Sequence, residues 1–103
     1  MYEQPTSPEK EITREQIIEA LKLGIDRPEV LQLLTEWTQQ QETRAKRPED
    51  NINVDRVRGH VYWEAGYTEA ALDSFEAAWV AAQQGGMMQL SEESAQEVED
   101  LKT

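Results

Sequence analysis

The feature that most constrains this chain is the spacing of small and aromatic residues in GHVYWEAGYTEAALDSFEAAW, residues 59–79. Two closely packed antiparallel helices need minimal side chains where they cross, aromatic rings to fill the remaining space, and a glycine that reverses the chain. The segment has small residues at Gly59, Ala71 and Ala78, aromatic ones at Tyr62 and Phe75, and Gly66 between the two halves. This spacing predicts a tight helical hairpin that reverses at Gly66.

The N-terminal part of the chain predicts another helical hairpin, over residues 13–45. Thr13 and Gln16 have the spacing of a capping box, which begins a helix, and Gly24 is placed to end that helix in the left-handed conformation. The next helix is expected to have Asp26 as its cap and Pro28 in its first turn.

The segment KRPEDNIN, residues 46–53, separates the two hairpins, because a proline, two asparagines and alternating charges indicate a break in helical structure. Asn53 is then expected to cap the third helix, and Thr68 the fourth. Gly85 and Gly86 are expected to end the fourth helix.

The two ends of the chain differ from its middle. Residues 1–10, which include two prolines, are expected to be a disordered leader. Residues 87–103 are expected to form either a short helix capped by Ser91 or a tail. Because no stretch alternates apolar and polar residues, no strands are expected. The prediction is an all-α fold of four helices, with a short fifth left open: a helical domain at 11–86 made of antiparallel hairpins at 13–45 and 53–85.

Within the second hairpin, the order Gly59, Tyr62, Gly66, Ala71, Phe75, Ala78 resembles the tetratricopeptide repeat, a helix–turn–helix unit of about 34 residues. The match covers about residues 52–85 as a single degenerate copy, beside an unrelated hairpin. The resemblance implies a protein-binding role, because such repeats hold peptides or partner helices in a groove. Whether the spacing reflects such a repeat or only the packing of a tight hairpin, Gly59, Tyr62, Ala71, Phe75 and Ala78 are expected to be core residues and not contacts.

The charge balance is strongly acidic, with 21 Asp and Glu against 10 Lys and Arg and a formal net charge of −11. Phosphates would be repelled, so nucleic acid is disfavoured as a partner and a basic protein is favoured. No apolar run approaches the length of about 18 residues that a membrane span needs. The first residues also lack the pattern of a secretory signal, so a cytoplasmic location is expected.

Catalytic and metal chemistry find little support in the sequence. Cysteine is absent, and the one histidine, His60, is expected to pair with Glu64 one helical turn away. Glu11, Glu15 and Glu19 line one helix face, but no histidine or facing acidic helix completes a metal site. No glycine-rich phosphate loop is present. We therefore expect no enzyme activity, no cofactor and no metal.

The first hairpin has an alternative interpretation, because Ala20, Gly24 and Val30 are spaced as in a DNA-binding helix-turn-helix. The start of its second helix offers Arg27 and Glu29, a poor set for reading bases and phosphates. A transcription regulator of this type stays an alternative. So does an acidic decoy that inhibits a nucleic-acid-binding protein by presenting rows of carboxylates.

The leading hypothesis is a small, non-catalytic protein-interaction module that acts as an adaptor, chaperone-like or regulatory protein. Exposed aromatic and flexible apolar side chains are good interface anchors, and arginines add charged contacts. The candidate contacts are Trp63, Tyr67, Met87, Met88, Arg56 and Arg58. The hypothesis also includes a homodimer, whose interface would be apolar surface on Trp37 or Trp63.

Overall fold

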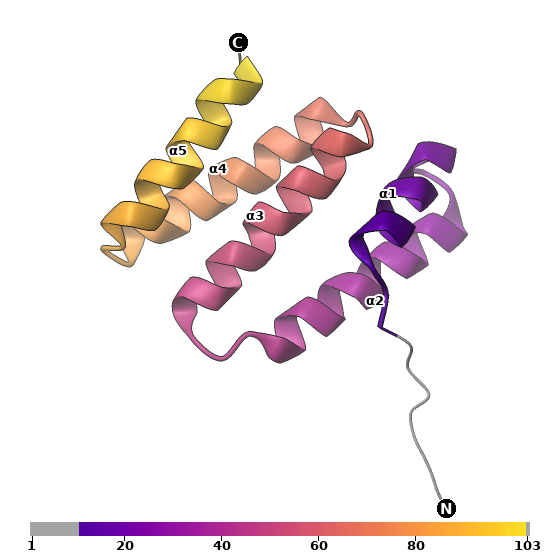
Figure 1. The fold of residues 1–103 in the computed structure, drawn as a ribbon, viewed down its shortest axis with the longest axis horizontal. Coiled ribbons are helices and arrows are strands. Elements are labelled where there is room, and N and C mark those ends of the chain that lie inside the picture. The colour runs from indigo at the N-terminus through magenta and orange to yellow at the C-terminus, as the bar shows by residue number, and fades with distance from the viewer. Residues whose placement is uncertain (1–10, 103) are drawn as a thin grey trace, which may run out of the picture.

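The secondary structure of residues 11–102, which the computed structural model describes, is entirely helical. The helices in order are α1 (Arg14–Leu23), α2 (Pro28–Arg44), α3 (Pro48–Glu64), α4 (Thr68–Gln84) and α5 (Met88–Lys102). Successive helices run in opposite directions (Figure 1). The predicted all-α fold of antiparallel hairpins is therefore confirmed. The predicted leader, residues 1–10, lies outside the described residues. No helix within residues 11–102 has the length and apolar character needed to cross a membrane.

Helices α3 and α4 pack so closely that Gly59 has no room for a side chain. A Cβ atom built on Gly59 would lie 2.6 Å from Cε1 of Phe75, far inside van der Waals contact. The Phe75 ring is fully buried, and so are Ala71 and Ala78 on the same helix. The predicted tight hairpin, with small residues at the helix contact and a reversal of the chain at Gly66, is confirmed.

The turns after α3 and after α4 have the same hydrogen bonds. At the first, the backbone N–H of Tyr67 donates to the carbonyl of Tyr62 (2.9 Å). At the second, the N–H of Met87 donates to the carbonyl of Ala82 (2.9 Å). Gly66 (φ 95°) and Gly86 (φ 70°) supply the positive φ that this Schellman arrangement requires. The repeated turn sends α5 back along α4, parallel to α3.

One apolar core connects all five helices. It contains Ile12, Ile17, Leu21, Val30, Leu34, Trp37, Val61, Tyr62, Ala71, Phe75 and Val98. Because Val98 belongs to α5, the helical body extends beyond residue 86, where the sequence had suggested a short helix or tail. Trp37 is only 1% exposed, so the dimer interface predicted for it is wrong and its indole fills the core.

Helix α3 begins at Pro48, five positions before the predicted cap Asn53. The reason is the Asp50 side chain, whose Oδ2 accepts hydrogen bonds from the backbone N–H groups of Lys46 and Arg47, both at 3.1 Å. The Lys46 bond is the largest cause that lowers the pKa of Asp50 from its ordinary value. A capped acidic first turn with proline at its start thus overrides the break that the composition suggested.

The other helix ends differ from the prediction by smaller amounts. The Thr13–Gln16 capping box is present as expected. Helix α2 is preceded by Arg27 instead of Asp26, with no side-chain cap, and Tyr67 instead of Thr68 precedes α4. Ser91 lies inside α5, where its N–H bonds to the Met87 carbonyl, so it is not the predicted cap. Gly24 does end α1, but with φ 147° and ψ 121° instead of the left-handed helical conformation.

Gly59→Ala is expected to lower the free energy of unfolding by about 1–2 kcal/mol. Overpacking costs about 1–3 kcal/mol, and a contact of 2.6 Å with a buried ring places this site in the upper part of that range, at about 2–3 kcal/mol. The gain of about 1 kcal/mol from replacing a mid-helix glycine offsets part of this cost. Equilibrium urea unfolding followed by circular dichroism measures the change.

The matched control adds Gly59→Ala to a Phe75→Leu background, which removes the ring that the new methyl group would strike. There the same substitution should cost little or even stabilise the protein. If Gly59→Ala alone leaves stability unchanged or raises it, the two helices do not approach as closely as described.

Candidate functional site: the seam between α3 and α5

Polar and aromatic side chains follow one face of α3 and meet a row of acidic and amide side chains on α5. The α3 residues recur at steps of four and three, and the α5 residues at steps of four, so each set shares one helix face. We call this strip the α3–α5 seam and define it as Glu49, Asn53, Arg56, His60 and Trp63 of α3 with Gln89, Glu93 and Glu97 of α5.

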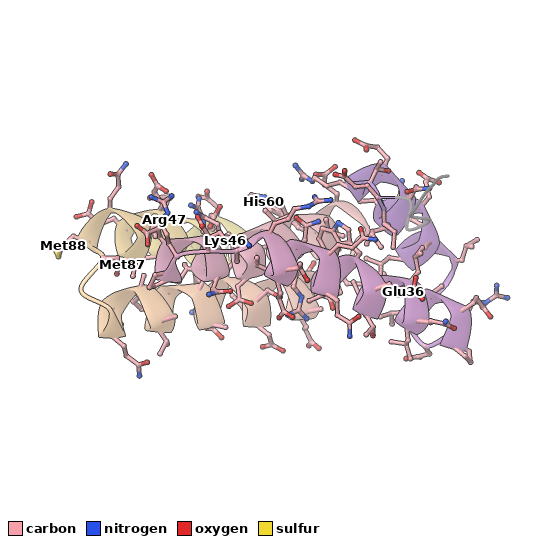
Figure 2. All side chains as sticks on the ribbon, turned by 90° about the horizontal axis from the view of Figure 1, so that it is seen from below. Glu36, Lys46, Arg47, His60, Met87 and Met88 are labelled. Carbon is pink, nitrogen blue, oxygen red and sulfur yellow. The ribbon has the colours of Figure 1, made fainter. Side chains whose placement is uncertain are left out.

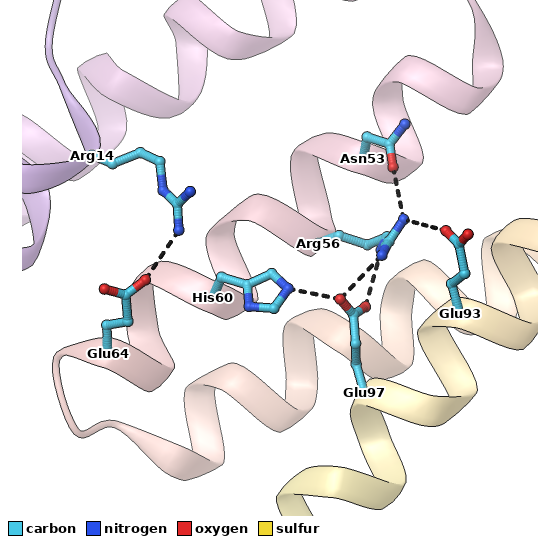
Figure 3. A network of polar contacts seen from close by, with 7 residues as sticks. All are labelled: Arg14, Asn53, Arg56, His60, Glu64, Glu93 and Glu97. Carbon is cyan, nitrogen blue, oxygen red and sulfur yellow. Dashed lines mark hydrogen bonds and ion pairs between the residues drawn. The ribbon is translucent and has the colours of Figure 1, made fainter.

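Arg56 occupies the centre of the seam and ties the two helices together (Figure 3). Its Nε and Nη2 donate to the two carboxylate oxygens of Glu97 at 3.0 and 3.1 Å, a bidentate pair. Its Nη1 donates to Glu93 Oε1 at 2.9 Å and to Asn53 Oδ1 at 3.2 Å. Every nitrogen of the guanidinium therefore has an acceptor within the protein.

The Arg56–Glu97 pair is more shielded from solvent than surface pairs such as Arg14–Glu64, whose side chains are 49% and 58% exposed. The Arg56 side chain is 21% exposed and that of Glu97 is 12% exposed. Hydrogen bonding to Glu97 is the largest cause that raises the pKa of Arg56 above its ordinary value. Because such a pair is partly shielded from water, it stabilises the α3–α5 arrangement more than a surface pair would.

His60 continues the network towards the C-terminal end of α3. Its Nε2 lies 2.7 Å from Glu97 Oε2, so the predicted pairing of His60 with Glu64 is wrong. Glu64 instead accepts a hydrogen bond from Arg14 of α1 at 3.1 Å (Figure 3). Spacing along α3 gives the wrong partner for His60, because the glutamate that His60 contacts lies on α5.

An aromatic group connects the seam to the close contact of α3 with α4. The His60 ring meets the Phe75 ring edge to face, with centroids 5.0 Å apart. Trp63 stacks near His60 at 6.2 Å and meets Phe75 edge to face at 6.4 Å. Trp63 is 40% exposed, so part of its indole faces solvent while the rest is held by these two rings.

The opposite end of the seam is a hollow next to the turn before α5 (Figure 2 labels Met87 and Met88 there). It has a volume of about 460 Å³ and is open to solvent. We call it the methionine hollow; its lining is Glu49, Asn53, Met87, Met88, Gln89, Leu90 and Glu93. Met88 is 73% exposed, the highest value among the large apolar residues described.

The structure separates the six contact residues predicted from the sequence. Trp63, Met87, Met88 and Arg56 lie on the seam or its hollow, although Arg56 has its donors occupied. Tyr67 lies elsewhere, and its hydroxyl donates to the carbonyl of Leu21 at 2.6 Å and accepts from the N–H of Ile25 at 3.1 Å. It therefore holds the α1–α2 hairpin against the α3–α4 turn.

Arg58 lies on another side of α3, within 3.8 Å of Asp55. Burial is the largest cause that raises the pKa of Asp55, although Arg58 opposes the shift. The Nε of Arg58 is buried without a hydrogen-bond partner. We leave Arg58 and Tyr67 out of the candidate surface.

Among residues 11–102, no group of three or more His, Cys, Asp or Glu side chains is placed to hold a metal ion. The acidic row suggested by the sequence is dispersed into surface pairs. Glu11 pairs with Arg44 at 3.1 Å, and Glu19 pairs with Lys22 at 3.5 Å. The seam combines exposed apolar surface at Trp63 and Met88 with charged side chains between them.

Comparison with known proteins identifies no relative: the chain matches no protein-family model, no curated protein and no solved structure.

Arg56→Gln is expected to lower the free energy of unfolding by about 1–2 kcal/mol, because it removes the bidentate arginine partner of the shielded Glu97 carboxylate and leaves only the contact with His60. Amide hydrogen exchange in α5 should become faster, since α5 loses its tie to α3. Urea unfolding and exchange monitored by NMR check both effects.

The matched control is Arg14→Gln, which breaks the Arg14–Glu64 pair, whose side chains are 49% and 58% exposed. Exposed pairs contribute about 0–1 kcal/mol, so this variant should stay close to wild type. Equal losses in the two variants would show that the Arg56 network has no special role.

Proposed function

We propose that this chain is a small, acidic, non-catalytic protein-interaction module, with an adaptor, chaperone-like or regulatory role. The observation that supports this most is the form of the α3–α5 seam. Trp63 is exposed at one end and Met88 at the other, while ion pairs of Arg56 fix the strip between them.

A fixed strip with apolar ends is suited to recognition. Ordering side chains on binding costs free energy, and a strip already held by ion pairs and ring contacts avoids part of that cost. Tryptophan is a frequent interface anchor, and methionine adapts its shape to different partners. Leu23, Leu31 and Val80 are also exposed, but they lie outside the seam, and single exposed apolar residues are normal.

Charge favours a basic protein as the partner. The net charge of −11 attracts cationic surfaces and accelerates their association. The similarity of residues 52–85 to a tetratricopeptide repeat points to the same class of function, and it stays part of this proposal. A homodimer through Trp63 and a cytoplasmic location also stay predictions.

Both alternative functions concern nucleic acid. The acidic decoy is favoured by exposed carboxylates such as Glu69 and Asp73 on α4. A helix-turn-helix regulator would use the start of α2, where Arg27 already lies 3.8 Å from Glu29. That pair leaves little positive charge for phosphates, so we rank the regulator last.

The test of the proposed function is affinity capture from the source lysate with wild type and with a Trp63→Ala/Met88→Gln variant. Proteins that bind the seam should be retained by wild type and depleted on the variant by about tenfold, since two anchors are removed. Quantitative mass spectrometry of the retained proteins gives the ratio.

A Leu31→Gln/Val80→Thr variant is the control, because it removes exposed apolar groups outside the seam. It should retain the same proteins as wild type, and circular dichroism should show full helicity for all three. Identical capture by the two variants would count against the seam, and the absence of any specifically retained protein would count against a binding function.

Ionic strength separates the main proposal from the decoy. A partner anchored by apolar contact should stay bound when salt is raised from low to physiological concentration, because only its charged contacts are screened. Binding that falls steeply over this range would favour the decoy. Isothermal titration calorimetry with a partner identified by capture, at several salt concentrations, measures the difference.

A further inference from the structure

We propose that the methionine hollow binds a basic segment of a partner protein. One long apolar side chain of the segment lies on Met87, Met88 and Leu90, and its lysine or arginine side chains pair with Glu49 and Glu93. The inference rests on the proposed function and adds the site and the chemistry of the partner.

The apolar floor of the hollow is anchored on one side and free on the other. Met87 and Leu90 pack against a small core cluster formed by Ile52, Ala78 and Ala82, so their positions are held. Met88 is 73% exposed and can fold over an incoming side chain. The hollow has a volume of about 460 Å³ and is open to solvent, so a side chain of a partner can enter it from outside.

The acidic walls give the hollow its charge preference. The side chains of Glu49 and Glu93 are 41% and 43% exposed, so both carboxylates can be reached from solvent. Glu49 has a long contact with Arg47 at 3.9 Å, which a closer cation from a partner would displace. The other residues that line the hollow, Asn53, Met87, Met88, Gln89 and Leu90, are uncharged. Cationic groups are therefore attracted to two positions on the rim, with the apolar floor beside them.

Glu93 links this hollow to the centre of the seam. One of its oxygens accepts from Arg56 at 2.9 Å, and the other accepts from the amide of Gln89 at 3.3 Å. A carboxylate offers about four acceptor sites, so Glu93 has capacity for a further cation. Arg56 holds Glu93 in place, and the geometry of the rim is thus set before a partner arrives.

The same charges argue against the other occupants of an open apolar hollow. Phosphate groups would approach two carboxylates, which is unfavourable. A second copy of the chain would bring another net charge of −11 to the contact. A basic segment gains from both features of the hollow, so it is the occupant to which the proposal commits.

The test uses two synthetic amphipathic peptides with identical leucine positions, one with lysine and one with glutamate at every charged position. Binding to the full chain is followed by NMR of backbone amides and methionine methyl groups. The lysine peptide should shift the Met87 and Met88 methyl signals first and most, and the glutamate peptide should have no effect.

Charge-matched variants show whether the acids of the hollow are responsible, because any basic peptide is attracted to a chain this acidic. Glu49→Gln/Glu93→Gln should weaken binding of the lysine peptide by about fivefold to tenfold. Glu69→Gln/Asp73→Asn changes the net charge equally on exposed positions of α4 and should weaken binding by less than about twofold.

The apolar contribution is tested by Met88→Gln, which keeps the length of the side chain but makes it polar. It should weaken binding by about fivefold or more. The matched control Val80→Thr, on α4, should have no effect. Circular dichroism and melting curves of all variants establish that they are folded.

The inference is overturned by any of three results. These are no binding of the lysine peptide at about 1 mM, equal losses in the two charge variants, or amide shifts centred outside the hollow. Shifts that depend on protein concentration without peptide would indicate a second copy instead. The proposed function has its own outcome. If capture depends on Trp63 while Glu49→Gln/Glu93→Gln captures normally, the binding module stands and only the assignment of the hollow fails.

Discussion

Contact between the Gly59 backbone and the Phe75 ring determines how closely α3 and α4 pack, and the rest of the structure is arranged around it. A Cβ on Gly59 would be 2.6 Å from the ring, so no other residue fits without moving a fully buried side chain. The same ring meets His60 and Trp63 edge to face. One aromatic side chain therefore sets the helix spacing on one side and supports the candidate site on the other.

The repeated turn extends this arrangement to α5. Because Gly66 and Gly86 adopt positive φ with the same hydrogen bonds, α5 returns along α4 and runs parallel to α3. Acidic residues one helical turn apart on α5 then face the arginine of α3, and Arg56 joins both helices. The seam is thus a consequence of two glycine turns and one close helix contact. Its ends, Trp63 and Met88, stay exposed, and the proposed function assigns the contact with a partner to them.

The sequence predicts the features of this fold that depend on local spacing. Gly59, Gly66 and Phe75 are recognisable because a close helical hairpin needs those residue types at those intervals. The pairing of Arg56 with Glu97 could not be predicted, since it joins residues 41 positions apart through a helix that the sequence left open. The composition of residues 46–53 does not predict the start of α3, because the segment indicates a break while a single side chain, Asp50, caps the helix there.

The central claim is that Gly59 lies directly against the Phe75 ring, and proton NMR in solution tests it most directly. The account predicts strong nuclear Overhauser effects between the α-protons of Gly59 and the ring protons of Phe75. It also predicts a marked ring-current shift of those α-protons. Absence of both, with Gly59 resonances near their random-coil positions, would contradict the account, because the helix contact that positions the seam would not exist.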